Sequence, residues 1–321
     1  MIKDLLLWIY WHPFKRIVQK IPPGMAHLLA RTMGNAAFVL AIRKRRAYER
    51  ELAAIPGSPR EGKELDRILR ETFQQVFSNE IEVLRFPMLN TSNIGAVVEC
   101  RGIEHLDAAL ARGKGVMLLF GHFGANQMIM PAVGYRGYAM SQMSAPATVW
   151  AEKLPNRTFS AMEKESHQLR WNHELSLPVR HINIFGSLKE VFACLKRNEI
   201  LGVAVDGGGG SHRVAVPFLG RQALISKGAA QIAMRTGCTV LPTFMVRGGS
   251  GKNTMIIEPP LDVRRGADAD TLAGQNLRLF MERFETYVIR HPSHYLPFLT
   301  LRHLMEQQGD TPLFSDGGNA G

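Results

Sequence analysis

His122 is the residue of this sequence best placed for chemistry, because it lies just beyond a buried strand pattern. The apolar run from Val116 to Phe120 stands between two glycines, which favours a strand covered on both faces in a mostly parallel sheet. Ligands of open α/β sheets bind beyond the carboxyl ends of the strands, so an imidazole at that position is well placed for chemistry. A histidine that caps a helix or bonds within the core is the structural alternative.

Asp206 repeats this arrangement at a second strand. It follows the apolar run from Ile200 to Val205 and is followed by four glycines, Gly207 to Gly210. Consecutive glycines let backbone amides approach a ligand closely, which suits a phosphate, an oxyanion or a thioester oxygen, and a flexible surface turn is the alternative. The Gly-Lys-Ser/Thr ending of a nucleotide-type phosphate loop is missing.

Composition limits the classes of fold and partner. The 321 residues, 45% of them hydrophobic, can bury a large core as one α/β domain with or without a small helical domain. Three cysteines without metal-like spacing predict free thiols and no metal site. The net charge of +11 favours polyanions, but no helix-turn-helix, zinc or aromatic-basic pattern indicates nucleic acid, which leaves an anionic membrane surface.

Residues 1–20 carry the membrane prediction, because aromatic side chains alternate there with lysine and arginine. Rings with polar tips and long cationic side chains suit the headgroup layer of a bilayer. The apolar run from Leu5 to Trp11 is far shorter than the roughly 20 residues of a spanning helix, and no small-residue cleavage site follows it. A helix that packs its apolar face on the domain is the alternative.

Apolar periodicity predicts two amphipathic helices at residues 24–50 and 61–86, the first closed by the basic run Arg43 to Arg46. Short apolar runs then alternate with helical patterns. Strands are predicted at 96–100, 116–120, 138–142, 179–184, 200–205 and 240–247, with a strand and turn at 214–221, and helices at 103–110, 125–133, 154–171, 188–196 and 228–235. This alternation predicts an α/β fold with a mostly parallel central sheet flanked by helices and preceded by N-terminal helices. We divide the chain into membrane-associating helices at 1–90, an α/β domain at 91–306 and a disordered tail at 307–321.

Four motifs occur in order between about residues 95 and 250. They read Gly-Lys-Gly-Val-Met-Leu-Leu-Phe-Gly-His-Phe-Gly, then Gly-Val-Ala-Val-Asp, Val-Pro-Phe-Leu-Gly-Arg and Gly-Cys-Thr-Val-Leu-Pro, with His-Pro-Ser-His-Tyr following from His291. Together they resemble the lipid A late acyltransferase branch of the lysophospholipid acyltransferase superfamily. The resemblance implies a glycerolipid acyltransferase-like fold and a peripheral enzyme on the cytoplasmic face of the inner membrane. It also implies transfer of a fatty acyl group from acyl carrier protein or coenzyme A to a hydroxyl of a lysolipid or glycolipid, with no further cofactor.

The family motif is a histidine, four residues and then an acid, and His122 matches the histidine as the proposed general base. The acid position holds Gln127, an amide that can orient an imidazole but cannot stabilise its charge. Asp206, which matches another acidic position of the family, is one substitute. Alternatively, the enzyme works with a weakened dyad, or the chain has lost catalysis and still binds acyl chains or lipids.

Substrate contacts are predicted from the same motifs. The residues are Gly121, Phe123, Gly124, Asn126, Gly207, Gly208, Arg213, Phe218, Gly220 and Arg221. Arg213 and Arg221 would hold a phosphate or a carrier's phosphopantetheine by charge-assisted hydrogen bonds, and surface salt bridges are the alternative for both. An apolar cleft between residues 128–133 and the first helices is expected to measure the acyl chain.

Overall fold

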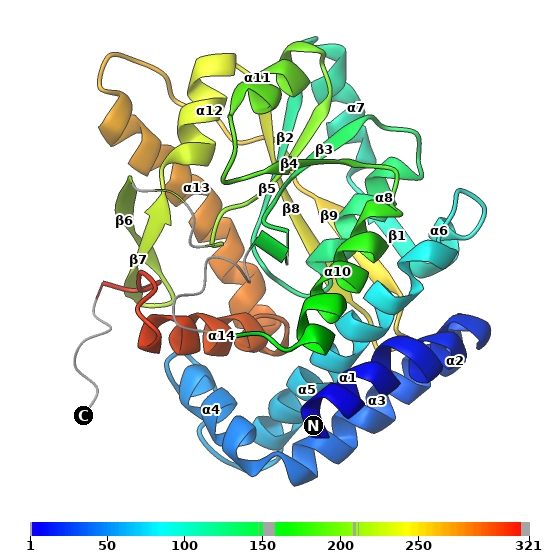
Figure 1. Ribbon diagram of the computed structural model, residues 1–321. Helices are drawn as coiled ribbons and strands as arrows, with labels where there is room; N and C mark the ends of the chain where they lie inside the picture. Colours follow the sequence, from blue (N-terminus) through cyan, green and yellow to red (C-terminus); the bar gives the residue numbers. More distant parts are fainter. Residues whose placement is uncertain (1, 147, 150–157, 208–209, 211, 316–321) are drawn as a thin grey trace.

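The computed structural model describes residues 2–315 except 147, 150–157, 208, 209 and 211. Its centre is a seven-stranded sheet in the order β1-β9-β8-β2-β5-β3-β4 (Figure 1). The strands are β1 Val98–Arg101, β2 Val116–Phe120, β3 Met140–Ser144, β4 Arg180–Asn183, β5 Ile200–Ala204, β8 Thr239–Arg247 and β9 Asn253–Ile257. Five of them are parallel, while β9 is antiparallel to β8 and carries β1 in its own direction, so the predicted mostly parallel α/β sheet is confirmed.

Alternating side chains of the central strands supply two core layers, one on each face of the sheet. Met117 and Leu119 of β2 belong to a cluster that contains residues of α4, α5, α11, α12 and α13. Val116, Leu118 and Phe120 belong to a second cluster with residues of α7 and α8. These helices are α4 Ile42–Ala53, α5 Gly62–Arg85, α7 Ile103–Ala111, α8 Ile129–Gly134, α11 Lys189–Lys196, α12 Gly228–Thr236 and α13 Ala269–Arg290. Because both faces are covered, the strand is apolar throughout rather than alternating.

The predicted helix at residues 24–50 is wrong as a single element. Two helices, α3 Pro23–Leu40 and α4, meet at Ala41 with a bend of 93°. The bend lets Phe38 of α3 and Tyr48 of α4 both pack against Phe73 of α5, at ring-centroid distances of 6.3 and 5.1 Å. The basic run Arg43 to Arg46 therefore lies near the start of α4 rather than at a helix C-terminus.

Residues 2–20 are helical and divide their apolar side chains between core and solvent. They form α1 Ile2–Ile9, a π-helical stretch η1 Tyr10–Phe14 and α2 Lys15–Lys20. Trp11 and Val18 are buried in a cluster with α3 and α5, whereas Leu5 and Leu6 are exposed. Among the described residues, no single helix is long and apolar enough to span a bilayer, and α3 with α4 passes that test only as the bent pair. Figure 1 shows these helices along one end of the molecule.

Several boundaries differ from the prediction. Residues 94–97 form the short helix α6 Ile94–Val97 before β1. The predicted strand and turn at 214–221 correspond to β6 Arg213–Phe218 and the turn after it, whereas β7 Arg221–Ser226, which pairs with β6 in an antiparallel hairpin, was not predicted. The predicted helix at 154–171 is α10 Ala161–Leu175, and its first predicted residues lie outside the described ones.

The C-terminal segment is ordered further than expected. Helix α14 Leu296–Gln307 is followed by Leu313 and Phe314, both of which are buried, and Phe314 forms a β-bridge with Ala223. The prediction of a disordered tail from residue 307 is therefore wrong as far as residue 315, and residues 316–321 lie outside the described chain. The domain division at residue 90 stays a prediction, although one core cluster contains residues from both sides of it.

Candidate active site

His122 and Asp206 meet at the carboxyl edge of the sheet because their strands are parallel neighbours. Phe120 of β2 is in register with Ala204 of β5, so the residues two positions later emerge side by side. Nδ1 of His122 lies 2.7 Å from Oδ1 of Asp206. The backbone N–H of His122 also donates to Oδ2 of Asp206 over 2.9 Å, which ties the loop after β2 to the loop after β5.

The carboxylate of Asp206 is completely buried, with 0% of its side chain exposed, and is satisfied by hydrogen bonds. Besides the two bonds from His122, Oδ2 accepts a bond of 3.0 Å from the hydroxyl of Tyr295. Burial, and then the charge of Asp206, raise the pKa of Tyr295 well above its ordinary value, so this hydroxyl keeps its proton and donates. A buried carboxylate needs such donors, because an unpaired one is costly.

The ring of His122 is fixed from a second side by Phe298 of α14. The two rings are stacked with centroids 4.4 Å apart and planes within 2° of each other. The side chain of His122 nevertheless remains 37% exposed. Because Nδ1 faces Asp206, Nε2 is the ring nitrogen available to a ligand, and no described residue hydrogen-bonds to it.

Two glycines of the predicted site serve close packing behind the histidine. A Cβ on Gly121 would lie 2.3 Å from the ring of Phe284 and 3.1 Å from Oδ2 of Asp206. Gly124 has a φ of +60°, and a Cβ there would lie 2.1 Å from the carbonyl oxygen of Met245. The Gly-His-Phe-Gly turn can therefore follow this path only with glycine at both ends.

Gln127 points away from the pair formed by His122 and Asp206. It lies in the short 3-10 helix η3 Asn126–Met128, where its Nε2 donates to Oε1 of Glu174 over 3.1 Å and its Oε1 accepts from Arg170 over 3.3 Å. Arg170 also pairs with Glu80 at 2.9 Å, and Glu80 accepts a 2.9 Å hydrogen bond from the hydroxyl of Tyr10. The residue at the family's acid position thus joins a polar network that reaches the N-terminal helices.

Comparison with known proteins identifies the family of this chain. The model of the bacterial lipid A biosynthesis acyltransferases matches residues 1–302. The chain belongs to this family. It is also 25% identical over 220 residues to the phosphatidylinositol mannoside acyltransferase of Mycobacterium tuberculosis, from the strains CDC 1551 / Oshkosh and ATCC 25618 / H37Rv. That match spans 67% of this chain and 63% of the relative's length.

Phe123 and Phe218 are buried core rings, and both pack against Phe284, at centroid distances of 6.0 and 5.2 Å. Both rings therefore belong to the core behind the histidine, and their predicted contact with a substrate stays a prediction. Gly207 lies beside the histidine, because a Cβ there would be 3.3 Å from Cε1 of His122, while Gly208 lies outside the described residues.

The other predicted contacts are spread over the neighbouring elements. Asn126 begins η3 and lines a very small cavity with Gln127. Nε of Arg213 bonds the carbonyl oxygen of Gly210 at 3.4 Å. Gly220 lies in the exposed turn of the β6–β7 hairpin, and the guanidinium of Arg221 stacks on Phe314 at 4.0 Å from the ring centroid. Their roles toward a substrate stay predictions.

Two residues of this candidate site were missed from the sequence. Tyr295 belongs to the His-Pro-Ser-His-Tyr motif, which predicted family membership but no role for the tyrosine, and Phe298 follows it by three residues. The expected apolar cleft has a counterpart in a cavity of about 80 Å³ between α3, α5 and Met128. This volume is well below the roughly 300 to 1,000 Å³ of typical ligand pockets, so a measuring role for it stays a prediction.

Proposed function

We propose that this protein is a peripheral membrane O-acyltransferase that uses His122 as general base and Asp206 in place of the acid missing at Gln127. It would transfer a fatty acyl group from acyl carrier protein or coenzyme A to a hydroxyl of a lysolipid or glycolipid. The observation that carries the proposal is the 2.7 Å contact between Nδ1 of His122 and a fully buried carboxylate. The named relative, which acylates a phosphatidylinositol mannoside by its name, supports a glycolipid acceptor.

The geometry of the pair defines the chemical steps. As a carboxylate, Asp206 only accepts hydrogen bonds, so the proton on His122 resides at Nδ1 and Nε2 has a free lone pair. Nε2 removes the proton of the acceptor hydroxyl while its oxygen attacks the thioester carbonyl carbon. The tetrahedral intermediate collapses with cleavage of the carbon–sulfur bond, and the imidazolium returns the proton to the leaving thiolate. Asp206 stabilises the imidazolium by its charge throughout.

Membrane attachment is proposed at the end of the molecule formed by α1 to α4. Large apolar side chains that remain exposed there are Ile2, Leu5, Leu6, Trp8, Ile9, Ile17, Met25, Leu28, Val39, Leu40 and Ile42. Exposed apolar side chains in such number are typical of an interaction surface, and the positive net charge of the chain favours anionic lipid. A peripheral position supplies a lipid acceptor without requiring a spanning helix.

The decisive experiment measures release of free carrier thiol from acyl-coenzyme A and acyl carrier protein in the presence of a panel of lysolipids and glycolipids. We expect acceptor-dependent release by wild type and a loss of about 10²–10⁴-fold in His122→Ala and Asp206→Asn, the range of general-base and orienting groups. Asp107→Asn is the matched control, because Asp107 also accepts a bond from a tyrosine hydroxyl, that of Tyr138, but at the surface.

Unchanged release by His122→Ala would refute the proposed base. The alternative function, an acyl-chain or lipid carrier on the same scaffold, is favoured by the loss of the acid at Gln127. It predicts no thiol release with any acceptor, together with acyl-chain binding that is indifferent to His122→Ala.

A further inference from the structure

A cavity of about 300 Å³ lies between α3, α5 and the segment that links α13 to α14. This volume is at the lower end of the roughly 300 to 1,000 Å³ of small-molecule pockets. Four arginines line it, and the single Asp or Glu carboxylate among the lining residues is that of Glu71. Such a wall attracts an anion, provided that its arginines are not already paired.

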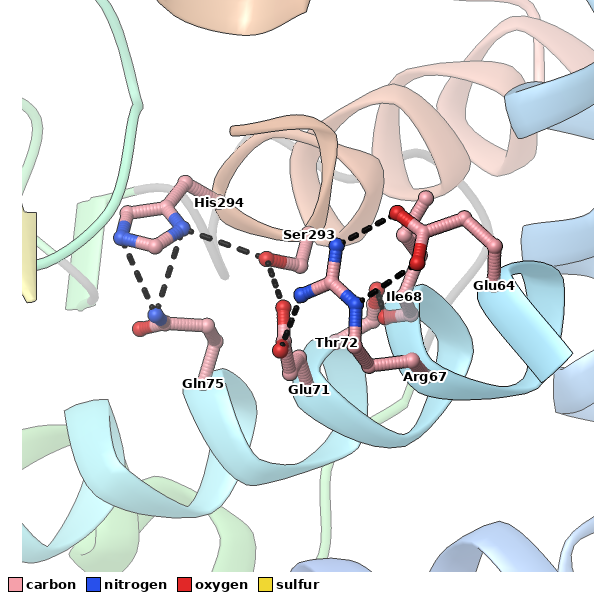
Figure 2. A network of polar contacts seen from close by, with 8 residues as sticks. All are labelled: Glu64, Arg67, Ile68, Glu71, Thr72, Gln75, Ser293 and His294. Atoms are coloured by element: carbon pink, nitrogen blue, oxygen red, sulfur yellow. Dashed lines mark hydrogen bonds and ion pairs between the residues drawn. The ribbon is translucent and has the colours of Figure 1, made fainter. Parts of the chain in front are cut away.

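Two of the four arginines are neutralised within the protein. Figure 2 shows Arg67 held between Glu64 and Glu71 along α5, at 2.6 and 2.5 Å. The same figure shows Ser293 reaching both Glu71 and the ring of His294. The negative charge of Glu71 is therefore compensated by Arg67, so this carboxylate repels an incoming anion less than an unpaired one would.

Arg247 pairs with Glu82 at 2.5 Å and is also bonded to the amide of Gln75. Arg31 and Arg290 differ, because neither has a hydrogen bond or ion pair to any residue in the part of the chain that the structure describes. The cavity thus carries two positive charges that the described protein leaves without a counter-charge.

The cavity wall also contains buried polar atoms that have no partner among the described residues. These atoms are Nε of Arg247, Oγ of Ser78 and Nε2 of His27. Arg247 and Ser78 are only 8% and 4% exposed. A guanidinium N–H is always a donor, and a buried donor without an acceptor is costly, so this wall is suited to an oxyanion.

We infer that this cavity binds a phosphate group in the headgroup of an anionic lipid, with Arg31 and Arg290 as its charge partners. Arginine matches phosphate by paired, charge-assisted hydrogen bonds. The lipid source is favoured by what lies next to the cavity. The mainly apolar cavity of about 80 Å³ shares His27 and Ser78 with it, and Met25 and Leu28 are exposed on α3 just before Arg31.

This inference rests on the proposed function, since it identifies the acceptor as a phosphate-bearing lipid. His294 links the cavity to the catalytic loop. Its carbonyl oxygen accepts from the N–H of Gly124 over 2.9 Å, and its ring lies 5.2 Å from that of Phe123. A headgroup in the cavity would therefore lie beside the loop that carries His122.

Calorimetric titration of the full-length protein with dihexanoyl phosphatidic acid, kept below its micelle concentration, tests the inference without acyl transfer. Dihexanoylglycerol, which lacks the phosphate, is the lipid control. We expect saturable binding of the phosphatidic acid alone and a loss of affinity of about tenfold or more in Arg31→Gln/Arg290→Gln, as for charge-assisted bonds to phosphate. The matched control is Arg112→Gln/Arg235→Gln, which removes the same charge from exposed arginines at the C-terminal ends of α7 and α12, and should change the Kd less than about twofold.

The outcomes separate this inference from the proposed function. Absence of saturable binding, or an equal loss in the Arg112→Gln/Arg235→Gln control, would overturn the cavity as the site. Inorganic phosphate that competes as well as the lipid would overturn the lipid headgroup as its source. His122→Ala should bind like wild type, and loss of binding in that variant would move the phosphate to the catalytic loop. Transfer that fails with every acceptor while this binding persists would refute the enzyme alone.

Discussion

Gln127 donates a hydrogen bond to Glu174 over 3.1 Å, at the position where the family motif has an acid. Burial raises the pKa of Glu174, while Arg170 and the amide of Gln127 act to lower it. An amide suits this place, because a carboxylate at residue 127 would face another carboxylate at hydrogen-bonding distance. Gln127, the residue that departs from the family motif, thus complements the carboxylate of Glu174 on α10.

We predict that Gln127→Glu lowers activity instead of restoring it. Two facing carboxylates replace a hydrogen bond, which should cost about 1–3 kcal/mol of unfolding free energy at pH 7. A raised pKa in the folded state means that stability is fully present below the unfolded pKa and is lost as pH rises through the folded pKa. The defect should therefore grow as pH rises above the ordinary glutamate value of 4.5, which denaturant unfolding between pH 4.5 and 8 measures.

The exchanged pair Gln127→Glu/Glu174→Gln is the control for this prediction. It restores one amide and one carboxylate in reversed positions, so it should recover most of the lost stability. A Gln127→Glu variant that is more active than wild type would show instead that residue 127 supports His122 directly.

The hydroxyl of Tyr295 donates to Oδ2 of Asp206, and we predict that it positions this carboxylate. We predict that Tyr295→Phe lowers kcat by about tenfold with KM nearly unchanged, because a hydrogen bond to a charged group contributes about 1.5–3 kcal/mol and the substrate is not touched. Tyr138→Phe removes a comparable bond to Asp107 at the surface and should leave kcat as it is. An increase in KM at constant kcat would assign Tyr295 to substrate binding.

We predict that protonation of His294 lowers the unfolding free energy at acidic pH. Burial, with the charge of Arg247, lowers its pKa from 6.5 to about 3, and Nε2 accepts from the backbone N–H of Arg247 over 3.1 Å. Stability from this lowered pKa is present above pH 6.5 and is lost as pH falls toward 3, by on the order of 4 kcal/mol. Denaturant unfolding of His294→Gln should show a flatter pH dependence over this window than wild type. The same slope in both proteins would contradict the prediction, and His303→Gln, on α14, is the control.

The sequence predicted the two strand ends that carry His122 and Asp206, but not the residues that contact them. The apolar runs before His122 and Asp206 identified two strand ends, and parallel strands bring such ends to one edge of the sheet. That β2 and β5 are neighbours could not be read from the pattern, because β3 and β4 intervene in the chain. The contacts of Tyr295 and Phe298 depend on how α14 docks, which local periodicity does not encode.

The predictions for the first long helix and for the tail were wrong, because tertiary packing overrides the local preference of the sequence there. No proline or glycine marks Ala41, yet the chain bends there because Phe38 and Tyr48 share one partner, Phe73. The tail appeared polar and glycine-bearing, but Leu313 and Phe314 bury their side chains against the domain. In both regions a few long-range apolar contacts decide the conformation.

The apolar side chains of α1 give the last prediction. Leu5 and Leu6 are exposed, so Leu5→Asp or Leu6→Asp should leave the unfolding free energy within about 0.5 kcal/mol of wild type. Each change should nevertheless lower partitioning onto anionic vesicles about tenfold or more, because a buried leucine side chain contributes about 1.5–3 kcal/mol. Cosedimentation with vesicles measures this, and Leu188→Asp is the control, because Leu188 is exposed beside α11 at the opposite end of the molecule (Figure 1). Equal partitioning of wild type and the three variants would place the membrane contact elsewhere. Binding that depends on salt but not on the leucine changes would show that the membrane contact is electrostatic attraction alone.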